Sequence, residues 1–300
     1  MQTGKRTAWL LVICLQFLVL GAGCVDLWSQ VASRDWGQEP AADGGIDDPT
    51  APRIPKPLER CPELTDGTVE LLGTSVRLWI GDQHASGGPL VVYWYGTGSS
   101  TAELTSNVGP DLEALLADGA VVAAITQTTE RGTITSTGTW STGDLFVVDE
   151  LVACASEKLG IDPRRVYTTG CSSGAIQAGV MATLRSSYVA SAALNSGGLV
   201  QQFDLQDSRH VPPVITTHGP QGSDVIIIDF ADASLALARD VVSRGGFAVD
   251  CPHDGNHCGA TPEIKAAQWQ FLTDHPYRID PEPYADGLPE GFPDSCTIIE

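Results

Sequence analysis

The 300-residue chain has few basic residues: 17 Lys and Arg stand against 37 Asp and Glu, which gives a formal net charge of −20 at pH 7. So few cations cannot form a basic face, and we therefore expect no nucleic-acid partner. Long apolar runs are also scarce, because only Ala8–Leu20 is continuous enough to suggest contact with a membrane. The hydrophobic share of 42% still allows a buried core, which excludes wholesale disorder.

The first 23 residues have the pattern of an export signal. Lys5 and Arg6 precede the run Ala8–Leu20, which is too short to span a membrane comfortably. Small residues then precede Cys24, as in a bacterial lipobox, although Gly21 stands where that motif usually has Leu. We expect a signal peptide over 1–23 and lipidation at Cys24. The chain would then be exported as an outer-membrane or cell-surface lipoprotein whose lipid anchor is its membrane contact; plain secretion and a signal anchor are the alternatives.

Residues 24–60 are rich in Ala, Asp, Gly and Pro and show little hydrophobic periodicity, so we expect a disordered tether. One domain is expected over 61–300, ending in a Pro-rich tail. The cysteines beyond the tether are Cys61, Cys154, Cys171, Cys251, Cys258 and Cys296. Their even number predicts disulfides in an exported chain, and the absence of any CxxC pair argues against a zinc ribbon.

Apolar runs and helical patterns alternate along this domain. The runs that suggest strands cover 69–72, 76–80, 90–95, 120–125, 165–169, 214–217 and 247–250. Runs that are apolar on both faces are typical of strands covered by helices on both sides. Helical patterns lie at 112–116, 145–155, 174–184 and 235–242, and a last helix opens at Thr261-Pro262. The alternation predicts an α/β domain, a three-layer sandwich with a mainly parallel central sheet.

The segment Gly170-Cys171-Ser172-Ser173-Gly174 has the pattern G-x-S-x-G. It directly follows a predicted strand and opens a predicted helix, which is the placement of a nucleophile elbow. We therefore predict that Ser172 is a catalytic nucleophile and that the Ser173 N–H points to where an oxyanion forms. A Ser- and Gly-rich turn without chemistry is the alternative.

Two further loops are expected at the same edge of the sheet as Ser172. The Gly-rich turn after the strand 90–95 would supply a second oxyanion donor, with the N–H of Thr97 as the first candidate and that of Gly98 as the next. The loop 126–143 contains Trp140, a candidate substrate-binding residue that could stack on an acyl group or a sugar. An aromatic ring that simply closes the loop onto the domain is an equally open interpretation.

The acid and the base should follow the nucleophile in that order along the chain. Asp224 lies in the loop after the strand 214–217, whereas Asp229 and Asp232 lie near a helix start and are expected to cap it. His257 lies in the loop between the last strand and the last helix. The predicted triad is Ser172, Asp224 and His257, and it needs no cofactor to hydrolyse an ester.

Two other classes of function are alternatives to this esterase. A metal site built from His253, Asp254 and His257 lacks an evident fourth ligand at sensible spacing, so no metal is expected. A non-catalytic surface lipoprotein or binding module is the other alternative, and the complete nucleophile, acid and base argue against it.

The cysteines beside these residues carry a family resemblance. Cys171 precedes Ser172 and Cys258 follows His257, and the order Cys-Ser, Asp, His-Cys resembles tannases and feruloyl esterases. The approach to the elbow, Asp162–Tyr167, resembles the polyhydroxybutyrate-depolymerase and feruloyl-esterase branch of the α/β-hydrolases. The resemblance covers about residues 61–296. It implies an α/β-hydrolase fold and a serine carboxylesterase acting on a polyester, feruloyl or short acyl ester.

The resemblance also implies a disulfide between Cys171 and Cys258. Proton transfer between Ser172 and His257 would bring these neighbours close enough for such a bond. A local staple between Cys251 and Cys258 is the alternative. For the remaining cysteines the expected pairs are Cys61–Cys296 and Cys154–Cys251. The chain departs from the family pattern at Tyr95-Gly96, where His-Gly is usual.

Overall fold

A computed structural model describes residues 48, 50–105, 111–136 and 139–300. The predicted signal peptide, the lipidation candidate Cys24 and most of the predicted tether lie outside the described residues. Within the described part, no helix is both long enough and apolar enough to cross a membrane.

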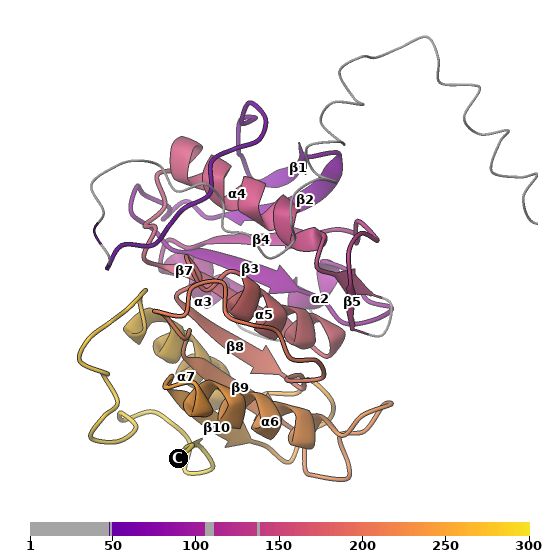
Figure 1. The fold of residues 1–300 in the computed structure, drawn as a ribbon, viewed down its shortest axis with the longest axis vertical. Coiled ribbons are helices and arrows are strands. Elements are labelled where there is room, and N and C mark those ends of the chain that lie inside the picture. Colours follow the sequence, from indigo (N-terminus) through magenta and orange to yellow (C-terminus); the bar gives the residue numbers. More distant parts are fainter. Residues whose placement is uncertain (1–47, 49, 106–110, 137–138) are drawn as a thin grey trace, which may run out of the picture. The chain divides into compact units, whose positions relative to one another are not determined.

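A nine-stranded sheet runs through the domain in the order β1-β2-β4-β3-β7-β8-β9-β10-β11 (Figure 1). Its strands are β1 (Gly67–Leu71), β2 (Thr74–Ile80), β3 (Leu90–Trp94), β4 (Val121–Ile125), β7 (Val166–Cys171), β8 (Ser191–Asn195), β9 (Val214–His218), β10 (Ala248–Pro252) and β11 (Thr297–Ile298). The strands from β4 to β10 in this order are parallel, whereas β1, β2 and β11 run antiparallel to their neighbours. The predicted mainly parallel sheet is confirmed.

Helices cover both faces of this sheet. In Figure 1, α4 (Asp144–Lys158), α5 (Ser173–Leu184) and α6 (Phe230–Ser243) lie in front of it, and α3 (Leu112–Ala117) and α7 (Pro262–Asp274) lie behind. The helices behind are joined by a hydrogen bond from Trp269 Nε1 to the carboxylate of Asp118, just after α3. Every residue of β3, β4, β7, β8 and β9 is buried between these layers. The apolar runs predict this burial for all of these strands except β8.

The strand β8 is the one central element that the sequence pattern misses. Its sequence, SAALN, contains a single bulky apolar side chain. The strand is nevertheless fully buried between β7 and β9, and α5 and α7 pack against it. Small side chains suit a strand that two helices approach closely, and such a strand lacks the bulk by which sequence patterns are recognised.

The domain begins earlier than the sequence predicts. The N–H groups of Leu58 and Glu59 donate to the carboxylate of Glu150 on α4, at 2.6 and 3.1 Å. The tether predicted for 24–60 therefore ends before this segment, which is held against the domain. Backbone hydrogen bonds to a distant side chain leave no periodic signal in the sequence.

The described residues contain three disulfides. They join Cys61 to Cys154, Cys171 to Cys258, and Cys251 to Cys296. The bond predicted between Cys171 and Cys258 is present, but the pairs Cys61–Cys296 and Cys154–Cys251 are wrong.

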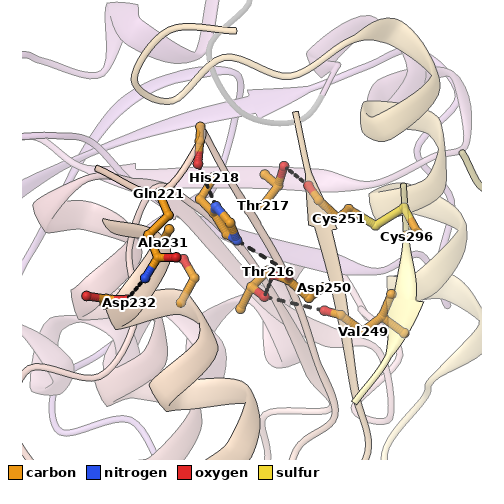
Figure 2. Close-up of polar contacts among 12 residues, drawn as sticks. Thr216, Thr217, His218, Gln221, Ala231, Asp232, Val249, Asp250, Cys251 and Cys296 are labelled. Atoms are coloured by element: carbon orange, nitrogen blue, oxygen red, sulfur yellow. Dashed lines mark hydrogen bonds and ion pairs between the residues drawn. A yellow bond between two sulfur atoms is a disulfide. The ribbon is translucent and has the colours of Figure 1, made fainter. Parts of the chain in front are cut away.

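The two unexpected pairings follow from how the ends of the domain are held. Leu58 and Glu59 are bound to α4, which brings Cys61 to Cys154 on the same helix. The tail returns as β11 along the edge of β10, with Val249 opposite Ile298. Cys251 and Cys296 therefore meet at that edge (Figure 2).

Candidate active site

Ser172 stands at the sharp junction between β7 and α5. Its φ of 57° and ψ of −124° lie outside the usual regions for a residue with a side chain, as a nucleophile elbow requires. The elbow passes close to the end of β3: a Cβ atom at Gly170 would lie 2.5 Å from the carbonyl oxygen of Trp94, and one at Gly174 would also collide with that oxygen. Glycine is needed at both positions because any side chain would push β3 and the elbow apart.

The loops after β9 and β10 bring Asp224 and His257 together. His257 Nδ1 lies 2.6 Å from Asp224 Oδ1. A carboxylate only accepts hydrogen bonds, so Nδ1 carries the proton and Nε2 is the basic nitrogen. Nε2 is buried and has no hydrogen-bond partner among the described residues. The ring of Phe230 packs on the imidazole, with centroids 4.6 Å apart, and helps to fix its orientation.

Asp224 is 4% exposed and its second carboxylate oxygen is also fully engaged. Asp224 Oδ2 accepts hydrogen bonds from Ser196 Oγ at 2.6 Å and from the Gly219 N–H at 3.0 Å. Burial opposes ionisation of this carboxyl, but the hydrogen bonds from Ser196, His257 and Gly219 together lower its pKa below the usual value. The acid is therefore held as a carboxylate beside the imidazole.

Sequence reasoning missed Ser196, which lies directly after the unrecognised strand β8. Its hydroxyl donates to Asp224 and accepts a hydrogen bond from the Cys258 N–H at 2.8 Å. Its φ of 47° is also unusual for a non-glycine residue. One buried hydroxyl thus ties the acid loop to the loop that carries His257. The Ser-Gly-Gly sequence after Asn195 would have been a signal, had the strand been recognised.

The disulfide Cys171–Cys258 lies directly beside the imidazole. The two sulfur atoms and a ring nitrogen of His257 lie within 4.8 Å of one another, and this is the group of possible metal ligands found in the described residues. Both sulfurs are bonded to each other, so neither offers a thiolate. The three atoms are better understood as a covalent tie between the elbow and the base loop.

The turn after β3 runs past Ser172. A Cβ atom at Gly96 would lie 3.3 Å from Ser172 Cβ. The Ser99 N–H donates to the Gly96 carbonyl at 3.1 Å, and Gly98 has a φ of 77°, which together define a tight turn with Thr97 in second position. Thr97 therefore lies in the turn that adjoins Ser172, and its role as an oxyanion donor stays a prediction.

Ser173, the other predicted donor, is the first residue of α5. The first N–H groups of a helix have no partner within the helix and point out of its end. The Ser173 N–H therefore lies at the first turn of α5, directly after Ser172.

Trp140 does not lie where a substrate could stack on it. Its side chain is 1% exposed, and its indole Nε1 donates to the carbonyl of Tyr95 at 2.9 Å. The ring packs edge-on against Trp94 and Tyr95, with centroids 5.0 and 4.8 Å apart. The residue belongs to the short strand β6 (Trp140–Ser141), which pairs with β5 (Ile134–Ser136). The structure therefore favours the alternative, in which this ring closes the loop onto the domain.

A second histidine, His218, contacts the loop that carries Asp224. His218 Nδ1 lies 2.7 Å from the Gly219 carbonyl. Its Nε2 lies 3.3 Å from Asp250 Oδ2 (Figure 2). Burial opposes protonation, yet these two acceptors raise the pKa of His218 above its usual value. The sequence showed this residue only as the end of a strand. Its neighbour Gly219 supplies one of the N–H groups that hold Asp224.

The comparisons with known proteins bear on the fold. The chain matches no protein-family model, and no curated protein matches its sequence. Among solved structures, native pOPH superimposes with a TM-score of 0.64 at 17% identity, over 80% of this chain and 96% of its own. Native sOPH gives 0.61 at 15% identity, over 80% of this chain and 96% of its own. A Ser-to-Ala variant of pOPH in complex with pNPB gives 0.61 at 17%, with the same coverage of both chains.

Likeness at such low identity concerns the fold. Together with the strand order and the elbow, it shows that the chain has the α/β-hydrolase fold. In this fold the carboxyl edge of the parallel strands carries the reactive groups, which is where Ser172, Asp224 and His257 lie.

Proposed function

We propose that the chain is a serine carboxylesterase with Ser172 as nucleophile, His257 as general base and Asp224 as the acid that orients the base. The observation that carries this proposal is the hydrogen bond between His257 and the buried Asp224, at the sheet edge that holds Ser172 in a strained elbow. A strained backbone and a buried carboxylate both lower the stability of the fold, so this arrangement is not explained by packing.

In the proposed reaction, Ser172 Oγ attacks the ester carbonyl carbon while its proton passes to His257 Nε2. The tetrahedral intermediate collapses, the bond to the leaving oxygen breaks, and His257 returns the proton to the departing alcohol. Water then attacks the acyl-enzyme, again losing a proton to His257. As the second intermediate collapses, the bond from the acyl carbon to Ser172 Oγ breaks and His257 returns its proton to that oxygen, which releases the carboxylic acid product and restores the Ser172 hydroxyl. Asp224 keeps Nδ1 protonated throughout and stabilises the imidazolium.

The negative oxygen of each intermediate would be held by the backbone N–H groups of Thr97 and Ser173. Both belong to segments that adjoin Ser172, and the amide at the start of α5 also benefits from the helix dipole. The reaction consumes only ester and water, so no cofactor is required.

For the substrate we propose the esters suggested by the polyhydroxybutyrate-depolymerase and feruloyl-esterase resemblance. Directly after Asp224, the side chains of Val225, Ile226 and Ile227 are 50%, 55% and 81% exposed. Aliphatic side chains exposed beside the reacting groups support an apolar acyl or polyester substrate. A Ser-to-Ala variant of pOPH, which has a similar fold, was solved in complex with pNPB. For this chain, p-nitrophenyl esters are a suitable first assay of ester hydrolysis.

The test is covalent labelling by a fluorophosphonate probe, which reacts with an activated serine. The wild type should be labelled and Ser172→Ala should not. Turnover of p-nitrophenyl esters, methyl ferulate and polyhydroxybutyrate would then rank the substrates. A folded wild type that neither reacts with the probe nor hydrolyses any of these esters would contradict the proposal and favour a binding module.

We also propose that the protein is exported and lipidated at Cys24. Three disulfides in the described domain support an oxidising compartment. Metabolic labelling with a palmitate analogue should mark the wild type but not Cys24→Ala. A mature chain released into the medium with an unmodified Cys24 would favour plain secretion.

A further inference from the structure

One peptide group beside the nucleophile is held at both of its polar atoms by side chains from elsewhere in the chain. The carbonyl of Tyr95 accepts a hydrogen bond from Trp140 Nε1 at 2.9 Å. The N–H of Gly96, in the same peptide group, donates to both carboxylate oxygens of Glu103, at 3.1 and 3.3 Å. Because a peptide group is planar, two such hydrogen bonds fix its rotation about the chain.

The carboxylate of Glu103 is itself fixed. It lies on the short helix α2 (Ala102–Thr105), and Tyr93 O–H donates to its Oε1 at 2.6 Å. Burial, reinforced by the adjacent Glu103 charge, raises the pKa of Tyr93 far above its usual value, so the phenol remains a donor. Glu103 therefore accepts one hydrogen bond from β3, through Tyr93, and another from the turn after it, through the Gly96 N–H.

Trp140 is held with equal firmness. Its ring is 1% exposed and packs between Trp94 and Tyr95, so the indole N–H cannot swing away from the Tyr95 carbonyl without opening the core. The loop containing β5 and β6 thus reaches the turn after β3 through this buried hydrogen bond and through a second hydrogen bond, between the hydroxyls of Thr97 and Thr139 at 2.6 Å.

The fixed peptide group lies next to the reacting atoms. A Cβ atom at Gly96 would lie 3.3 Å from Ser172 Cβ and 3.4 Å from Glu103 Oε2. The following peptide group carries the N–H of Thr97, and its direction depends on the orientation of the group before it. The hydrogen bond from Ser99 to Gly96 then closes the turn on this fixed start.

We propose that Glu103 and Trp140 are positioning residues of the oxyanion hole: by holding the Tyr95–Gly96 peptide group, they aim the Thr97 N–H at the developing oxyanion. The inference rests on the proposed esterase function. Neither side chain touches the substrate. Both act through the backbone, and their loss should weaken binding of the tetrahedral intermediate more than binding of the ester.

The experiment compares Glu103→Ala and Trp140→Phe with the wild type on one soluble p-nitrophenyl ester. We expect kcat to fall by about 10- to 100-fold, because a misplaced oxyanion donor loses much of its effect, while KM changes by less than about threefold. The affinity of an alkyl boronic acid, which forms a tetrahedral adduct with Ser172, should fall in parallel with kcat/KM. A role confined to stability would lower the unfolding midpoint without producing this parallel.

Two matched controls and one rescue sharpen the test. Trp269→Phe removes a buried indole donor bonded to Asp118, on the opposite face of the sheet, and Glu150→Ala removes a buried carboxylate that accepts the N–H groups of Leu58 and Glu59. Both should leave kcat near the wild-type value. Glu103→Gln keeps an oxygen acceptor for Gly96 and should recover most of the activity lost in Glu103→Ala.

The possible outcomes separate this inference from the esterase proposal. An active wild type whose folded Trp140→Phe and Glu103→Ala variants retain kcat would overturn the positioning role. So would a loss of kcat without loss of boronic acid affinity. Should Glu103→Ala fail to fold, Trp140→Phe carries the same decision, because it preserves the buried ring. An inactive wild type would instead refute the esterase function itself.

Discussion

The two sides of the proposed active site are held by different means. On one side, the nucleophile elbow and the base loop are joined by the disulfide Cys171–Cys258, and Ser196 adds a buried hydroxyl bridge to Asp224. On the other side, the turn after β3 contains no cysteine, and it is held by hydrogen bonds to Glu103, Trp140 and Thr139 and by the packing of the Trp140 ring on Tyr95.

The difference follows from what each side must do. Proton transfer between Ser172 and His257 requires two loops from distant parts of the sequence to keep hydrogen-bond distance, and a covalent tie limits their drift. An oxyanion donor belongs to a backbone that already adjoins the nucleophile, so only its rotation needs to be fixed. Chemical reduction should therefore act on the first side, and single substitutions of buried polar residues on the second.

Removing the nucleophile should have the largest effect. Ser172→Ala is expected to lower kcat by at least about 10⁴-fold, since no other group can form the acyl-enzyme, while the fold is retained. Esterase kinetics and circular dichroism would check both statements. Activity near the wild-type level would direct the search to Ser173 and would undo the division of the site into two sides.

Substitution of the acid comes next. Asp224→Asn should lower kcat by about 10⁴-fold, because the amide no longer holds the His257 tautomer with its proton on Nδ1. The matched control is Asp229→Asn: the Asp229 carboxylate caps α6 by accepting from Ala231 and Asp232, and asparagine caps nearly as well. Were Asp229→Asn the damaging change, the assignment of the acid would be wrong.

Removing the covalent tie should have a smaller effect. The double variant Cys171→Ser/Cys258→Ser is expected to lose about tenfold in kcat/KM and about 2–4 kcal/mol in the free energy of unfolding. The pair Cys61–Cys154 closes a loop of similar length, with a separation of 93 residues against 87. Its double serine variant should lose comparable stability in urea but keep its kcat. Equal activity losses in both variants would show that the disulfide acts through general stability.

The smallest effect on activity is expected from His210, which touches neither side. Burial lowers its pKa from 6.5 to about 4 in the folded protein, where Nε2 donates to the Val189 carbonyl. Between these values the unfolded chain binds a proton that the folded domain does not, so stability should fall with pH from about 6.5 to about 4, by roughly 3 kcal/mol at most. His210→Gln should flatten this slope in urea titrations and leave kcat at pH 8 unchanged. A persistent slope would assign the acid sensitivity to other groups.

Much of the sheet could be predicted because its central strands are continuous apolar runs. The exception, β8, is built from Ser, Ala, Leu and Asn, whose small side chains reflect the close approach of α5 and α7. The pairing of Cys61 with Cys154 also escaped prediction, since it depends on Glu150 capturing the backbone before the first cysteine. Contacts between distant segments leave little trace in local patterns.

The proposed site shows the same division. Chain order and strand ends were enough to select Ser172, Asp224 and His257, and the structure joins the last two by a hydrogen bond. Ser196 was hidden because the strand before it was not recognised. The sequence shows Trp140 as an aromatic residue in a loop at the expected edge of the sheet, whereas its burial and its hydrogen bond to the Tyr95 carbonyl show that it supports the backbone there.

The order of the disulfides along the chain constrains how the protein can be made. Cys61 pairs with the next of the domain's cysteines, Cys154, but Cys171 must pass over Cys251 to reach Cys258, and Cys251 in turn passes over Cys258 to reach Cys296. A chain oxidised as it emerges would first join Cys171 to Cys251. The native set therefore requires the later strands to be in place before oxidation, or a thiol–disulfide isomerase to repair early bonds. Biosynthetic yield of active protein should depend on that isomerase.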